Sequence, residues 1–179
     1  KAGAAGVDPI DYLYDFLLED GGTRFASLSA VDLPARMGVL QEMLLHPDTV
    51  TGLSDAGAHV TLICDGSMPT TQLTYWTRDR EKGEKIPVEF IVRKQTALNA
   101  QLYGFKDRGA LEQGKKADIN VIDMDNLRVS PPVPHHDLPT GGTRLMQPVT
   151  GYINTLCNGI SAREFDHDTG ERPGRLVRS

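Results

Sequence analysis

The chain has 179 residues, 39% of them hydrophobic, which is enough to bury a substantial core as one domain or two small ones. Nineteen basic residues against twenty-four acidic ones give a formal net charge of -5, so no positive field is available to attract nucleic acid or anionic lipid. No apolar run approaches the ~18 residues of a membrane span and no signal-peptide pattern opens the chain, so we expect a cytoplasmic protein without a membrane or nucleic-acid partner.

Helical patterns dominate the chain before Gly104. Asp8 and Pro9, followed by an apolar stripe through Phe16, predict a helix that begins with a capping aspartate and ends near Glu19. Helix then alternates with strand, which favours parallel βα units over a series of hairpins. The further elements expected here are a strand over 23–28, a helix over 33–45, a strand over 49–53, a helix over 70–79 and a helix from 87 to 104.

After Gly104, glycine and proline punctuate short alternating runs, which indicates strands. The clearest runs are 117–123 and 151–156, and Gly159 is expected to join the second of these to 160–165 in a hairpin. The two domains that this change of pattern predicts are residues 1–103 and residues 104–179.

The segment from Thr49 to His59 is the best candidate for an active-site edge. A short apolar run there leads into Asp55, which lies in a glycine-containing turn beside a histidine. A carboxylate at the C-terminal end of a β-strand is where α/β enzymes commonly place a metal ligand or a general base. The alternative, that Ser54 or Asp55 merely caps a helix or shapes a turn, stays open.

Other conspicuous residues have structural interpretations that we favour over functional ones. Cys64 and Cys157 are far apart in the sequence, which indicates neither a disulfide framework nor a zinc knuckle, and Cys64 is expected to be a buried thiol. Three aromatic residues are expected to pack in the core rather than form a wall for an acyl chain, and a mixed-charge run is expected to be a solvated surface. The aromatic residues are Tyr75, Trp76 and Tyr103, and the basic residues of the run are Arg78, Arg80, Lys82 and Lys85.

Several motifs, in order, resemble a known family. The run from Gly104 to Asp123 resembles the segment that follows the barrel in the metal-dependent amidohydrolase superfamily. The turn at 54–59 lies upstream, and Asn158-Gly159, Thr169-Gly170 and the run 172–175 lie downstream. Together they make the chain, from about His46, similar to the D-aminoacylase branch, the N-acyl-D-amino-acid deacylases.

The resemblance implies a fold and a chemistry. The fold class would be α/β, with residues 1–103 forming the C-terminal βα units of a TIM-type (β/α)₈ barrel and residues 104–179 a small β-sandwich segment. In the family, zinc lies at the barrel mouth, and Asp55 matches the aspartate beside the metal-bound water. Asp55 would accept a proton from that water while the water attacks an amide carbonyl. It would then return the proton to the departing amine.

The same resemblance suggests residues that contact the substrate, an N-acyl amino acid or related amide. Ser54, Gly57 and His59 flank Asp55 and are the candidates for this role. For His59 an ordinary hydrogen bond within the turn is the alternative interpretation. Asp55 is also a candidate metal ligand, although the family's other zinc ligands have no counterpart here.

The chain departs from the family pattern at the metal site. The family gathers zinc with a His-x-His pair, and no two histidines here are separated by one residue. His135 and His136 are adjacent, so in an extended segment they would point to opposite faces of a strand. A complete barrel needs about 200 residues or more. We therefore expect this chain to be the C-terminal part of a zinc enzyme. By itself, this part is expected to bind no zinc and to hydrolyse nothing.

Two function hypotheses follow from different classes. The first is a zinc-dependent hydrolase of non-peptide C–N bonds to which this chain contributes Asp55. The second is a non-catalytic module that serves in assembly or regulation. Under the first hypothesis, barrel strands without neighbours would expose an unpaired edge and an apolar face. The isolated segment is therefore expected either to form homo-oligomers or to dock its helices differently from the parent enzyme.

Overall fold

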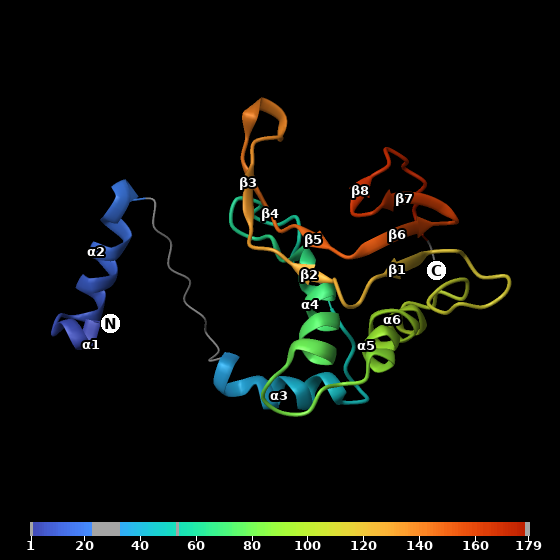
Figure 1. Ribbon diagram of the computed structural model, residues 1–179, viewed down its shortest axis with the longest axis horizontal. Helices are drawn as coiled ribbons and strands as arrows, with labels where there is room; N and C mark the ends of the chain where they lie inside the picture. The colour runs from blue at the N-terminus through green and yellow to red at the C-terminus, as the bar shows by residue number, and fades with distance from the viewer. Residues whose placement is uncertain (1, 23–32, 53, 178–179) are drawn as a thin grey trace. The chain divides into compact units, whose positions relative to one another are not determined.

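The computed structural model describes residues 2–22, 33–52 and 54–177 (Figure 1). They form two compact units, the N-terminal unit Lys1–Met43 and the C-terminal unit Leu44–Ser179. The strand expected over 23–28 lies outside the described residues. The domain boundary expected near residue 104 lies inside the C-terminal unit, where helices give way to strands, and stays a prediction.

The N-terminal unit contains α1 (Ala2–Ala5) and α2 (Pro9–Gly22). The helix α2 begins as predicted, because the Asp8 carboxylate accepts hydrogen bonds from the amide of Ile10 at 2.8 Å and from that of Asp11. It continues past the expected end at Glu19 to Gly22. The apolar stripe is only partly covered, since Ile10 is 75% exposed. The next helix, α3 (Leu33–Leu45), matches its expected range and ends just before Pro47.

The C-terminal unit continues with a run of helical turns. They are the 3₁₀ helix η1 (Asp65–Ser67), α4 (Met68–Thr74) and the π-helix η2 (Tyr75–Asp79). This run confirms the helix expected over 70–79. The helix expected from 87 to 104 is two helices, α5 (Val88–Gln95) and α6 (Ala97–Leu102), because Thr96 has a non-helical backbone conformation.

The strands of the C-terminal unit pair only in antiparallel fashion among the described residues. One sheet has four strands in the order β1-β6-β7-β8, and two smaller sheets pair β2 with β5 and β3 with β4. A 3₁₀ turn, η3 (Pro139–Gly141), connects β3 to β4. The strands are β1 (Ile119–Ile122), β2 (Arg128–Val129), β3 (Val133–His135), β4 (Arg144–Met146), β5 (Val149–Thr150), β6 (Tyr152–Cys157), β7 (Ile160–Glu164) and β8 (His167–Asp168).

The predicted hairpin after Gly159 is confirmed. The strands β6 and β7 pair in the four-stranded sheet, and the two residues between them, Asn158 and Gly159, have φ values of 51° and 81°. Two successive positive φ angles are the requirement of a type I′ turn, and Asn-Gly is the pair that meets it most easily. The turn therefore sets the register of the hairpin locally.

The prediction of parallel βα units is wrong for the described residues. No strand forms over 49–52, and Leu53 lies outside the described residues. A parallel strand needs a neighbour that is distant in sequence to complete its hydrogen bonds. The described residues supply no such neighbour, and the side chains of Thr49 and Thr51 bond instead to atoms of α5 and α6. The observed architecture is a mixed α/β fold with antiparallel sheets.

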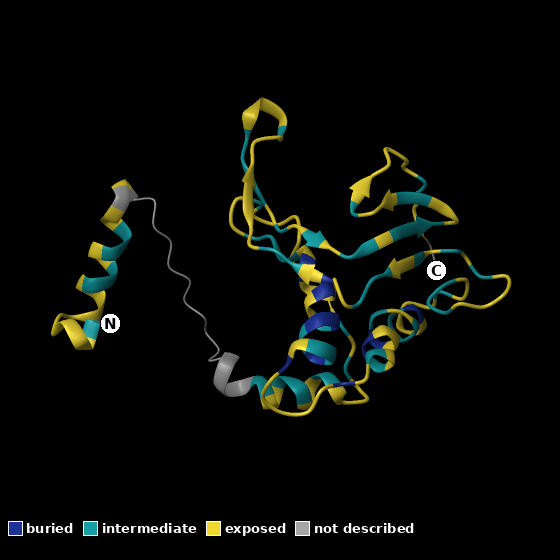
Figure 2. Ribbon diagram, in the orientation of Figure 1, coloured by how far each residue is buried: buried dark blue, intermediate teal, exposed yellow. Residues whose placement is uncertain are grey.

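The core lies where the helices meet the strand β2, and the most buried positions cluster on α4, η2, α5 and α6 (Figure 2). Leu127 and Ile91 have no exposed surface. The expectation that Trp76 packs in the core is confirmed, whereas Tyr103 is 65% exposed and stacks only on Phe105. The apolar residues that are buried are Leu73, Trp76, Ile86, Ile91, Ala100 and Leu127.

The mixed-charge run is not simply a solvated surface, contrary to the prediction. Arg80 is 5% exposed and its guanidinium lies 4.6 Å from the ring centre of Trp76. Arg78 donates hydrogen bonds to the carbonyls of Met124 and, at 2.7 Å, Leu127, and also pairs with Asp79, which raises the pKa of Arg78. A planar guanidinium group can stack on a ring and donate hydrogen bonds, which is how Arg80 is accommodated in the core, whereas Arg78 is half-buried at its edge. Lys82 and Lys85 are exposed as expected.

None of the helices in the described ranges combines the length and the apolar character needed to cross a membrane.

We predict that Gly151→Ala destabilises the C-terminal unit by about 3 kcal/mol. Gly151 has a φ of 109°, and a Cβ there would lie 2.6 Å from the Cα of Leu127, a backbone atom that cannot rotate away. Gly174→Ala is the matched control, because its Cβ would have no neighbour within 4 Å; its stability should change by less than about 0.5 kcal/mol. Equal denaturant midpoints for the two variants would contradict the prediction.

Candidate active site

The segment that carries Asp55 is a series of tight turns rather than the end of a strand. Asp55, Gly57 and His59 have φ values of 56°, 94° and 43°. The carbonyl of Asp55 accepts a hydrogen bond from the amide of Ala58 at 3.2 Å, and that of His59 accepts from Leu62 at 2.7 Å. Aspartate and glycine enter the left-handed region more readily than most residues, which explains why these types occupy the turn.

Neighbouring elements support this turn from the C-terminal side. A Cβ on Gly66 of η1 would lie 3.5 Å from the Cβ of Ala56, so η1 packs closely against the turn. The amide of Leu145 on β4 donates to the carbonyl of Val60 at 2.8 Å. The buried hydroxyl of Ser67 also donates to the side chain of Gln147, just after β4.

The predicted site residues lie together only because they are neighbours in sequence. Asp55, Gly57 and His59 are exposed, and Ser54 is half-buried. Within the described residues, no hydrogen bond is found to the Asp55 carboxylate. An exposed carboxylate can accept a proton or contribute one ligand to a metal. The turn therefore presents the exposed carboxylate of Asp55.

The described residues do not fit a complete zinc site. They contain no group of three or more His, Cys, Asp or Glu side chains close enough to hold a metal ion. His135 lies at the end of β3, and the ring of His136 is hydrogen-bonded to Thr143 at 2.9 Å. Next to them Asp137 is held by Arg144, whose hydrogen bonds lower the pKa of this carboxyl group. This hairpin uses its polar groups internally, so it is no substitute for the missing ligands.

The two cysteines are free thiols. Cys64 is half-buried immediately before η1, and Cys157 is half-buried at the end of β6. Neither is reached by a second cysteine, as their separation in the sequence predicted.

Comparison with known proteins identifies the family. The model of the amidohydrolase family matches residues 5–160, which is most of the chain and includes the Asp55 turn. The chain belongs to the amidohydrolase family.

The curated relatives of this amidohydrolase chain are much longer than it is. Uncharacterised proteins of Mycobacterium bovis and Mycobacterium tuberculosis are 29% identical over 124 residues, which is 68% of this chain and 20% of theirs. A 5-methylthioadenosine/S-adenosylhomocysteine deaminase of Haloarcula marismortui is 30% identical over 146 residues, 75% of this chain and 31% of the deaminase. The chain thus spans between a fifth and a third of their lengths. No solved structure matches it.

The sequence of this amidohydrolase chain did not lead us to expect a buried lysine near the site. Lys94 on α5 is 2% exposed, and burial lowers the pKa of its amine. Its amine donates to the carbonyl of His46 at 3.0 Å, close to the start of the segment that leads to Asp55. Helical spacing could have indicated its burial, because Lys94 lies three residues after Ile91 and therefore on the same buried face of α5.

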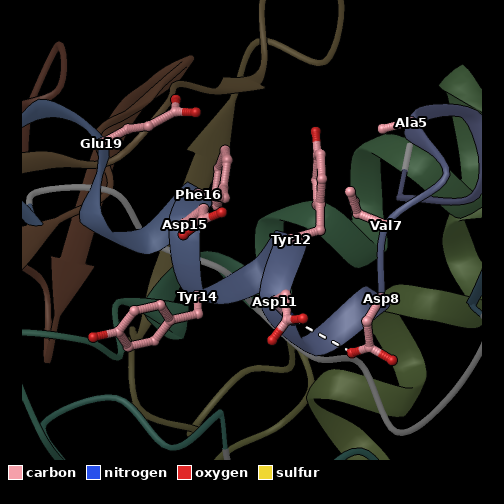
Figure 3. Close-up of a pocket in the computed structure, with 9 residues that line it drawn as sticks. All are labelled: Ala5, Val7, Asp8, Asp11, Tyr12, Tyr14, Asp15, Phe16 and Glu19. Atoms are coloured by element: carbon pink, nitrogen blue, oxygen red, sulfur yellow. Dashed lines mark hydrogen bonds between the residues drawn. The ribbon is translucent and has the colours of Figure 1, made fainter.

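A hollow of about 750 Å³ lies in the N-terminal unit, along α2 and the residues before it. Figure 3 shows Tyr12 and Phe16 one helical turn apart on the same side of α2, with Tyr14 directed away from them. Among the described residues that line it there is no histidine or cysteine, and none of the predicted site residues. The hollow is a groove beside a single helix and does not compete with the Asp55 turn as a catalytic candidate.

The backbone of the turn predicts different stabilities for substitutions of Asp55. Asp55→Ala should destabilise the protein by about 1 kcal/mol, because alanine enters the left-handed region only at that energetic cost, whereas Asp55→Asn should change stability by much less. Asp48→Ala is the control, since Asp48 is exposed and does not have a positive φ. Thermal unfolding that ranks the alanine and asparagine variants at Asp55 as equal would contradict this account of the turn.

Proposed function

We propose that this chain is part of an amidohydrolase that hydrolyses a C–N bond of a small molecule, with Asp55 as the group that transfers the proton. The observation that carries the proposal is the family match over residues 5–160, within which Asp55 is exposed in a turn held between η1 and β4. The family supplies the reaction class, and the turn supplies an accessible carboxylate.

The proposed step needs a group that both accepts and returns a proton. As water attacks the carbon of the C–N bond, it loses a proton to the Asp55 carboxylate and forms a tetrahedral intermediate. Collapse of that intermediate expels the nitrogen, which takes the proton back from Asp55 and leaves as an amine. The carboxylate is ionised again at the end of the cycle. Ser54, Gly57 and His59 are proposed to contact the substrate, because they flank Asp55 in the same turn.

For the substrate class, an N-acyl amino acid is proposed first, and the D-enantiomer is the form that the motifs favour. A second candidate comes from the relative in Haloarcula marismortui, which is named a 5-methylthioadenosine/S-adenosylhomocysteine deaminase. Both reactions add water to a carbon atom and expel nitrogen from it, so the role of Asp55 would be the same. The two candidates differ in whether the carbon is an amide carbonyl or part of a heterocyclic ring.

We further propose that, within the whole enzyme, residues 1–103 belong to a TIM-type barrel and residues 104–179 to a sandwich domain, the division that the resemblance implies. Zinc is the metal proposed for the whole enzyme. Because the described residues hold no metal-binding group, the zinc ligands are proposed to come from outside this chain, with Asp55 contributing one at most. The proposal therefore assigns to this chain the proton transfer and the support of the turn.

Asp55→Asn in the intact enzyme tests the proposal. Asparagine keeps the size and the left-handed backbone but cannot accept the proton, so turnover of the amide should fall by roughly 100-fold or more. Bound zinc, measured by mass spectrometry, should be nearly unchanged. Asp48→Asn, which removes an equivalent exposed carboxylate from the same segment, should retain its activity.

The outcomes separate three roles for Asp55. Full activity in Asp55→Asn would rule out the proton-transfer assignment. Loss of zinc together with activity would assign Asp55 as a metal ligand instead. Loss of turnover with zinc retained supports the proposal.

A further inference from the structure

Lys94 is a charged side chain buried in a place where an apolar residue would be expected. It lies on the inner face of α5, close to Ile91, and only 2% of it is exposed. The lysine amine has three donors, and three oxygens surround it. These are the carbonyl of His46 at 3.0 Å, the hydroxyl of Thr49 at 2.7 Å and the carbonyl of Thr49.

The acceptors explain why a charge is tolerated there. Residues 46–52 form neither helix nor strand, and the carbonyl of His46 also accepts the amide of Thr49 at 3.3 Å. A buried amine without hydrogen bonds is unfavourable, and these oxygens compensate Lys94 for its lost hydration. The same bonds tie His46 and Thr49 to α5.

A second set of bonds ties the same segment to the helices. The hydroxyl of Thr51 donates to the carbonyl of Lys94 at 3.3 Å and accepts from the side chain of Asn99 on α6 at 3.0 Å. Hydrogen bonds from α5 and α6 thus fix the segment 46–51, whose last residue lies four positions before Asp55. On the far side of the turn, Val60 is held by Leu145.

We propose that Lys94 is a positioning residue for the turn that carries Asp55. The turn is anchored at both ends, by Lys94 and Thr51 before it and by β4 after it. Within the described residues no hydrogen bond fixes the Asp55 carboxylate itself, so its location depends on the backbone that Lys94 holds. The catalytic part of this inference rests on the proposed function of Asp55, whereas the anchoring of the turn does not.

Hydrogen–deuterium exchange in the intact protein tests the anchor directly. In Lys94→Met, amides of residues 50–60 should exchange roughly tenfold faster, which corresponds to the loss of one charge-assisted hydrogen bond. Exchange in the β6–β7 hairpin should not change. Arg93→Met is the matched control, because Arg93 is the exposed neighbour of Lys94 on the same helix, and it should leave residues 50–60 as they are.

A milder variant covers the case in which Lys94→Met fails to fold. Thr51→Val keeps the branched shape but removes the hydroxyl between α5 and α6, so it should also speed exchange over residues 50–60, by a smaller factor. Unchanged exchange in this variant, or in a folded Lys94→Met protein, overturns the proposal.

Kinetics of the intact enzyme distinguish positioning from a general loss of structure. A misplaced turn should lower kcat for the amide because Asp55 no longer meets the attacking water, whether or not KM also changes through the substrate contacts proposed for the same turn. A change in KM alone would overturn the positioning role. Exchange reports on the turn whether or not Asp55 is catalytic. A failure of the proposed function therefore appears as full activity in Asp55→Asn, and a failure of the anchor appears as unchanged exchange.

Discussion

The bonds between the Lys94 amine and the carbonyls of His46 and Thr49 are the interaction on which the candidate site depends. Between α3 and η1, residues 46–52 and 54–64 form no regular helix or strand, and their backbone groups still require hydrogen-bond partners. A buried lysine meets this requirement from a helix that is distant in sequence. The direction in which the chain enters the Asp55 turn therefore follows from a packing position on α5.

Polar side chains also connect separate elements in the rest of the C-terminal unit. Arg78 binds carbonyls in the connection between β1 and β2, and the carboxylate of Asp166 accepts the amides of Gly151 and Tyr152 at 3.0 and 2.8 Å. Thr70 and Tyr152 connect α4 to β6 through their hydroxyls at 2.8 Å. Such bonds are directional, so they orient the helices against the strands more specifically than a small apolar core could.

Local signals in the sequence predicted the elements that depend on local interactions. The capping of α2 by Asp8, the range of α3 and the Asn158-Gly159 hairpin all follow from residues within a few positions of one another. The strand expected over 49–53 did not form in its described part, because its hydrogen bonds go to Lys94 and Asn99 instead of to a neighbouring strand. The burial of Lys94 is tied to the same long-range bonds. The Asp55 turn was found from its residue types, but the support of the turn could not be read from them.

We propose that these residues provide a positioned carboxylate and that the metal ligands lie elsewhere. The most direct measurement is a zinc titration of the purified 179-residue chain, combined with an assay of its hydrolysis of an N-acyl amino acid. The account predicts no tight, stoichiometric zinc binding and no hydrolysis above background. Tight binding of one zinc ion together with cleavage by this chain alone would contradict it.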